Sequence, residues 1–125
     1  VSDIISCATL AIQPLIRGDW LSPGVHLDLV GGYRPDMREA DDVAITRCRI
    51  YVDTLEGALS EAGDLTQPIG KGLISSEVLE GELSDICRGT VTGRQNPEEC
   101  TLFKSVGSAI EDLAAAELVW DRTRK

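Results

Sequence analysis

The chain has 125 residues, 42% of them hydrophobic and 26% charged, with 21 acidic and 12 basic side chains for a formal net charge of −9. This composition is typical of one globular domain that needs no metal or disulfide support, and no apolar run approaches the roughly 20 residues that cross a bilayer. The negative charge repels polyanions, so neither nucleic acid nor a membrane is an expected partner.

The first residues carry no sign of a targeting segment. Position 1 is Val rather than Met, and residues 1–10 lack the basic start and long apolar centre of a secretory signal. We therefore interpret the chain as a cut or processed piece of a longer protein.

The N-terminal third predicts two strands. Residues Asp3–Thr9 form a short apolar run rich in Ile and small side chains, which is typical of a buried strand. Residues Val25–Val30 alternate in part and stop at the pair Gly31-Gly32, as expected for a second strand that ends in a tight turn. Thr9 and the glycine pair therefore follow the carboxyl ends of two predicted strands.

The next segment predicts a helix, a strand and a second helix. Residues Glu39–Arg47 begin with acids and end with a base, which matches the helix dipole, and we expect the leading acids to lie in solvent. Residues Arg49–Asp53 have strand character, and Thr54 can cap a helix over Leu55–Ala62 that stops at Gly63. This alternation predicts a parallel α/β sheet.

The last third predicts two more helices. A glycine-punctuated connection over Gln67–Leu73 leads to a short helix over Glu80–Cys87 that ends at Arg88-Gly89. The apolar side chains that then recur at helical spacing are Val106, Ala109, Ile110, Leu113, Ala116 and Trp120. They predict a long amphipathic helix from Ser105 to about Arg122.

The four cysteines, Cys7, Cys48, Cys87 and Cys100, contain no C-x-x-C pair, and His26 is the single histidine. This spacing argues against a zinc site, so no bound metal is expected. Each cysteine lies in an apolar or mixed segment, where a free thiol commonly fills space. We therefore expect reduced thiols and a cytoplasmic protein.

Few local patterns indicate chemistry. The glycine pair at 31 and 32 permits close approach of a ligand at the carboxyl edge of a sheet, but taken alone the pair is explained more simply by an ordinary tight turn. Gly70-Lys71-Gly72 is not a phosphate loop, because the pattern needs Gly where Leu65 stands and a hydroxyl where Gly72 stands. Lys104 is a single charge to which the local pattern assigns no role.

Five segments together resemble the ornithine cyclodeaminase and mu-crystallin family. They are ISCATLAIQP (5–14), HLDLVGGYRPDMREADD (26–42), IYVDTLEGALSEAGDL (50–65), GELSDICRG (81–89) and TLFKSVGSAIEDLAAAELV (101–119). The matches cover nearly all of the chain in order, and they correspond to the C-terminal portion of the family.

The resemblance implies an α/β fold that supplies the second half of a Rossmann-like parallel sheet. Residues 1–104 would form a partial NAD(P)-binding domain, and residues 105–125 a long helix that returns to a dimerisation and substrate domain outside the chain. The G-x-G-x-x-G fingerprint that binds the cofactor's pyrophosphate is absent from the sequence. We therefore expect the isolated chain to be inactive.

The resemblance also implies roles for single positions. Residues that would contact the cofactor, NAD or NADP, are Thr9, Val30, Gly31, Gly32, Tyr33, Met37 and Ser105. Val106 would contact the substrate, and Tyr33 occupies the position of the family's catalytic acid/base. Ornithine-cyclising members carry Asp where Tyr33 stands and Lys where Met37 stands. Because a phenol is neutral at pH 7 and cannot replace a carboxylate as a base, the chain is nearer the cyclic ketimine reductase branch.

The resemblance implies that the whole protein is a homodimeric oxidoreductase that reduces a cyclic imino acid such as Δ1-pyrroline-2-carboxylate. Ornithine cyclodeaminase, which converts L-ornithine to L-proline and ammonia, is one alternative. A non-catalytic protein that binds NADPH or another small ligand is a second. The sequence does not separate NAD from NADP, because the residue that reads the ribose would lie in the first half of the domain.

Overall fold

Five short parallel strands form one sheet in the computed structural model, which describes residues 2–124. The strands are β1 (Ile4–Cys7), β2 (His26–Leu29), β3 (Arg49–Val52), β4 (Leu79–Glu82) and β5 (Thr101–Lys104). Their order across the sheet is β1-β2-β5-β3-β4, so β5 lies at the centre although it comes last in the sequence. The predicted parallel α/β fold is confirmed.

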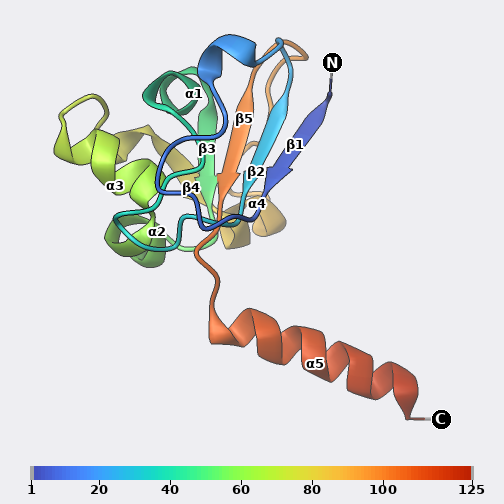
Figure 1. Cartoon of the computed structure of the whole chain (residues 1–125). Helices are drawn as coiled ribbons and strands as arrows, with labels where there is room; N and C mark the ends of the chain where they lie inside the picture. Colours follow the sequence, from blue (N-terminus) through green and yellow to red (C-terminus); the bar gives the residue numbers. More distant parts are fainter. Residues whose placement is uncertain (1, 125) are drawn as a thin grey trace.

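Short helices flank the sheet. Within the described residues the α-helices are α1 (Asp42–Arg47), α2 (Leu55–Glu61), α3 (Gly63–Gly70), α4 (Leu83–Arg88) and α5 (Ala109–Thr123), with 3-10 turns at Gly18–Trp20 and Ser76–Val78. Figure 1 shows α1, α2 and α3 grouped on one side of the sheet, while α5 projects away from it. No helix in residues 2–124 is long and apolar enough to cross a membrane.

The hydrophobic core lies between the central strands and the helices α1, α2 and α3. Leu27 and Leu29 of β2 and Val52 of β3 are 0% exposed, and Ile50 is 1% exposed. β2 and β3 both pair with β5, so these four side chains belong to one parallel sheet as predicted.

Capping side chains define the starts of two helices, one of which differs from the prediction. Asp41 accepts the N–H of Ala44 at 2.8 Å, so α1 begins at Asp42 rather than at Glu39. Thr54 accepts the N–H of Gly57 at 3.3 Å and caps α2 as predicted.

Three predicted elements need correction. β1 is an edge strand rather than a buried one, because only β2 pairs with it among the described residues, and Ile4 is 66% exposed. α3 occupies part of the predicted connection over Gln67–Leu73, with Pro68 inside the helix. The predicted helix over Glu80–Cys87 is wrong in its first half, because Leu79–Glu82 is strand β4.

The last helix begins four residues later than predicted. Ser105 to Gly107 precede it as a linking segment, because the Asp53 carboxylate accepts the N–H groups of Val106 and Gly107 at 2.8 Å each. Gly107 also has a φ of +81°, a conformation that glycine adopts readily. From Ala109 to Thr123 every side chain is exposed, so α5 buries no side chain against the other elements of residues 2–124.

Candidate functional site

Most of the residues implied by the family resemblance gather at the carboxyl edge of the sheet. Thr9 follows β1, Val30 to Gly32 follow β2, and Ser105 with Val106 follows β5. Cys7 pairs with Leu29, and Leu29 pairs with Lys104, so the three strands end level with one another. Parallel sheets bind ligands at this edge.

The loop after β2 packs tightly on its own chain. Val30 and Gly31 donate their N–H groups to the carbonyl of Cys7 at 2.8 and 3.4 Å. A Cβ at Gly31 would collide with the backbone of Thr9 and with Glu39 Oε1, and a Cβ at Gly32 would lie 2.6 Å from Asp64 Oδ2. Internal packing therefore requires glycine at both positions. The sequence did not indicate this reason for the glycine pair.

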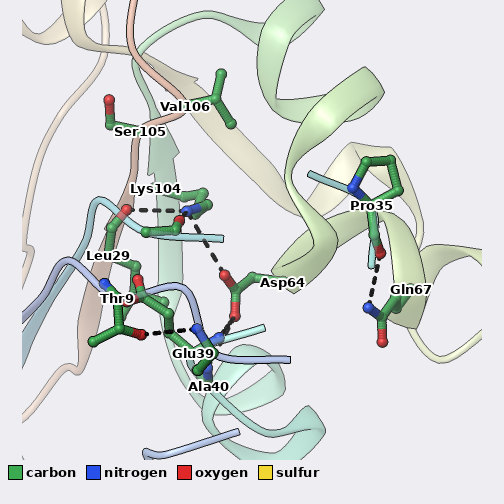
Figure 2. Close-up of polar contacts among 12 residues, drawn as sticks. Thr9, Leu29, Pro35, Glu39, Ala40, Asp64, Gln67, Lys104, Ser105 and Val106 are labelled. Atoms are coloured by element: carbon green, nitrogen blue, oxygen red, sulfur yellow. Dashed lines mark hydrogen bonds and ion pairs between the residues drawn. The ribbon is translucent and has the colours of Figure 1, made fainter. Parts of the chain in front are cut away.

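Beneath this loop lies a buried charged cluster, formed by Glu39, Asp64 and Lys104, each of which is 0% exposed. Lys104 Nζ contacts the carbonyl oxygen of Leu29 at 3.3 Å and that of Gly31 more closely. It also forms an ion pair with Asp64 Oδ2 at 3.7 Å. Figure 2 shows Lys104 between Leu29 and Asp64.

The two carboxylates of the cluster bind backbone groups. Asp64 Oδ1 accepts the N–H groups of Glu39 and Ala40 at 2.9 Å each, and Glu39 Oε1 accepts the N–H of Thr9 at 2.6 Å. Glu39 Oε2 and Asp64 Oδ2 are buried and have no hydrogen-bond partner among the described residues. The expectation that the acids at 39–42 lie in solvent is therefore wrong for Glu39.

Burial dominates the electrostatics of this cluster. Removal from water raises the pKa of Asp64, although backbone N–H groups and Lys104 oppose the change. The same desolvation lowers the pKa of Lys104, against the attraction of Asp64 and Glu39. Sequence reasoning missed this cluster.

A second carboxylate positions the segment after β5. Asp53, which is 7% exposed, accepts the Ser105 hydroxyl at 3.0 Å as well as the two N–H groups of the linking segment. Its other oxygen accepts the N–H of Thr54 at 2.7 Å. Ser105 and Val106 therefore hold their places at the edge through Asp53, a residue that the sequence did not single out.

The remaining implied residues differ in exposure. The side chains of Val30 and Tyr33 are 45% and 43% exposed, so both are open to a ligand. Met37 is 5% exposed, so its side chain is buried rather than open to a ligand.

Within residues 2–124 no three His, Cys, Asp or Glu side chains are grouped to hold a metal ion. All four cysteines are free thiols.

Comparison with known proteins identifies relatives of the whole segment. The sequence matches the Ornithine cyclodeaminase/mu-crystallin family over residues 1–125. An uncharacterised protein of Schizosaccharomyces pombe is 52% identical over 123 residues, which cover 95% of this chain and 37% of that protein. The Δ1-pyrroline-2-carboxylate reductase of Paracoccus denitrificans is 43% identical over 118 residues, which cover 94% of this chain and 37% of that protein.

A solved structure has the same fold. It is the Δ1-pyrroline-2-carboxylate reductase of Thermococcus litoralis in complex with NADH and L-proline, with a TM-score of 0.92 and 41% sequence identity. The match covers 96% of this chain and 37% of that one. The chain thus spans a little more than a third of the length of these relatives.

Proposed function

Because the chain belongs to the ornithine cyclodeaminase/mu-crystallin family, we propose that the whole protein is an NAD(P)-dependent reductase of a cyclic imino acid such as Δ1-pyrroline-2-carboxylate. The observation that carries this proposal is the edge at which the loops after β1, β2 and β5 meet, with Val30 and Tyr33 open beside the Ser105–Val106 segment. Relatives at 43% and 41% identity with this activity in their names support the choice of substrate class.

The edge fits the nicotinamide end of a dinucleotide. The residues that would contact NAD or NADP there are Thr9, Val30, Gly31, Gly32, Tyr33 and Ser105. Met37 belongs to the same proposed set, but its side chain is buried, so it would act on the cofactor indirectly through the residues around it. Val30 offers an exposed apolar surface on which a flat ring can pack. The bound cofactor would supply a hydride to the C=N carbon, while the chain orients the two reactants and excludes water.

Tyr33 is the proposed polar contact to the imine. Its phenol O–H can donate a hydrogen bond, which suits the nitrogen of a cyclic imine or the substrate carboxylate. It lacks the carboxylate that could act as a base toward the amine of ornithine. With Val106 as a substrate contact, this set of side chains favours imine reduction over ornithine cyclisation.

The domain organisation forms part of the same proposal. Residues 1–104 would complete a Rossmann-like domain with an N-terminal half outside the chain, and residues 105–125 would pack on the dimerisation and substrate domain of a homodimer. Residues 1 and 125, which end these ranges, lie outside the described residues. The exposed apolar side chains of α5, Ile110, Leu113, Leu118, Val119 and Trp120, support this placement. A cytoplasmic location is consistent with four free thiols.

The test is an assay of the full-length protein with NADH and NADPH. We expect the absorbance of the reduced nicotinamide to fall when Δ1-pyrroline-2-carboxylate is added, because NADH or NADPH is oxidised. Proline formed from ornithine without net consumption of NADH or NADPH would instead identify an ornithine cyclodeaminase. Binding of NADPH without turnover of any cyclic imine would identify a non-catalytic binding protein.

A further inference from the structure

The buried charged cluster connects three separate parts of the site. Glu39 binds the backbone of Thr9 in the loop after β1. Asp64, in the first turn of α3, binds the backbone at Glu39 and Ala40. Lys104, at the end of β5, contacts the backbone carbonyl of Gly31 in the loop after β2. Loops that follow different strands are thereby held by one set of side chains.

The cluster also forms the surface on which the glycine loop lies. The space that a Cβ at Gly31 would need is taken by Glu39 Oε1 and the backbone of Thr9. At Gly32, which has a φ of +63°, the corresponding space is taken by Asp64 Oδ2. The backbone of the loop therefore rests directly on the two carboxylates, with the ammonium of Lys104 bound to its carbonyl.

Lys104 has a distinct place in this arrangement. Of the three charged side chains it alone is cationic, and it lies within ion-pair distance of Asp64. Its side chain is 0% exposed and lies below the edge, so it does not reach the open surface where a ligand would bind. The groups that its ammonium contacts are the carbonyl oxygens of Leu29 and Gly31 and the carboxylate of Asp64, so its direct contacts are with the loop rather than with a ligand.

We propose that Lys104 is a positioning residue, which fixes the Val30–Tyr33 loop from below and so sets the place of the nicotinamide ring relative to the imine. This inference rests on the proposed function, because it assigns the loop to the cofactor. A misplacement of about 1 Å is enough to slow a reaction by about 100-fold. The role predicts a loss in kcat that exceeds any change in the KM for NADH, since Lys104 contacts the Val30–Tyr33 loop and the sequence has no G-x-G-x-x-G loop that would bind the pyrophosphate.

The experiment compares three variants of the full-length protein. Lys104→Met removes the ammonium while keeping the length of the side chain. Lys104→Met/Asp64→Asn also neutralises the carboxylate that would otherwise lose its counter-ion, and Asn keeps the oxygen that accepts two N–H groups. Lys71→Met is the matched control, because the Lys71 side chain is 51% exposed and forms an ion pair with Asp42 at 3.1 Å, away from the cluster.

Two readouts separate a positioning role from a structural one. Hydrogen exchange is followed at Val30 and Gly31, which donate to Cys7, and at Gly63, which donates to Gly32. In the double variant we expect Tm to recover toward wild type while exchange at these amides stays at least about tenfold faster. We also expect kcat to fall by about 10- to 100-fold, with the KM for NADH changed less than about threefold.

Several results would overturn the proposal. The first is a double variant whose loop amides exchange at the wild-type rate, or whose amides exchange faster by the same factor over the whole sheet. The second is a double variant with the kcat of the wild type. The third is a Lys71→Met variant that shows the same effects. If Lys104→Met does not fold, the exchange rates and kcat of the double variant alone test the proposal. If the unmodified protein reduces no cyclic imine, the proposed function fails, and the exchange data still decide whether Lys104 positions the loop.

Discussion

At the scale of single residues, Tyr33 distinguishes the two reactions considered for this site. The side chain is 43% exposed and follows the glycine loop directly. In the full-length protein, Tyr33→Asp introduces a carboxylate that can act as a base toward the amine of ornithine. We expect it to raise the ratio of ornithine cyclisation to imine reduction, as measured by proline formation and by NADH consumption.

The control for Tyr33 is Tyr33→Phe, which removes the hydroxyl and adds no charge. It should slow imine reduction by about 10-fold or more, as expected for one lost hydrogen bond of about 1.5 kcal/mol, without creating cyclisation. An unchanged activity ratio in Tyr33→Asp together with an unchanged rate of imine reduction in Tyr33→Phe would remove Tyr33 from the site.

Gly31 is expected to tolerate no side chain. Gly31→Ala places a methyl group against the backbone of Thr9 and the carboxylate of Glu39. Overpacking of this kind lowers the free energy of unfolding by about 1–3 kcal/mol, which denaturant unfolding measures. Gly70→Ala is the control, because no atom lies within 4 Å of a Cβ at that position. Equal stability of the two variants would contradict the packing described for the loop.

The cysteines should differ sharply in reactivity. Burial raises the pKa of the Cys48 thiol from 9.0 to about 12. Cys48 therefore stays protonated at pH 8, and Cys100 is buried, whereas Cys87 is exposed. A thiol reagent at pH 8 should modify Cys87 first and reach Cys48 only on unfolding. Fast modification of Cys48 in the folded protein, located by mass spectrometry, would oppose this account.

At the scale of elements, the carboxylate of Asp53 holds the link between the sheet and α5. Its Oδ2 accepts the Ser105 hydroxyl and two backbone N–H groups. Asp53→Asn can replace that oxygen by an amide NH2, which accepts nothing. We expect a loss of about 1–3 kcal/mol in stability and faster hydrogen exchange at Val106 and Gly107.

The control for Asp53 is Asp36→Asn, which removes an exposed carboxylate that forms an ion pair with the exposed Arg34. An exposed pair contributes little to stability, so this variant should unfold like the wild type. Equal protection of Val106 and Gly107 in all three proteins would show that the linking segment does not depend on Asp53.

The elements that sequence patterns predicted are those with local signals. β2 ends at a glycine pair, α2 begins at a capping Thr54, and β3 is rich in β-branched and aromatic side chains. β4 and β5 had no such signal, because Leu79–Glu82 contains a glycine and two acids and Thr101–Lys104 ends in a lysine. Both are strands through their pairing with β3, which is a tertiary contact.

The site was predicted only in part for a similar reason. Thr9, the glycine pair and Ser105 were found because each matches a family segment. Glu39 and Lys104 were not, since a charged residue in isolation is usually solvated and their burial depends on contacts across 25 or more positions. The helix dipole pattern at 39–47 even favoured the opposite interpretation for Glu39.

At the scale of the whole molecule, the isolated 125-residue chain should bind dinucleotide poorly. Its sequence contains no G-x-G-x-x-G loop to bind the pyrophosphate, and each charge-assisted hydrogen bond that is missing is worth roughly 1.5–3 kcal/mol. Calorimetric titration with NADH and NADPH should therefore detect no micromolar binding and the chain should show no turnover. Micromolar binding by a monomer would overturn this expectation.

The isolated chain should also associate with itself. Ile110, with 73% of its surface exposed, and Trp120, with 57%, lie on α5, which buries no side chain against the rest of the described part of the chain. An exposed apolar surface of this kind normally marks an interface. Sedimentation should show species larger than a monomer, and Ile110→Ser/Trp120→Ser should shift them toward the monomer. A monomeric wild-type chain would contradict the interface assigned to α5.

The central claim is that the full-length protein passes a hydride to the C=N carbon of a cyclic imino acid. The most direct test uses NADH that carries deuterium at the transferred position of the nicotinamide, with Δ1-pyrroline-2-carboxylate as substrate and mass spectrometry of the product. Our account predicts proline with deuterium at the α-carbon, formed in proportion to the NADH consumed. Proline without deuterium, or no product while NADH is bound, would contradict it.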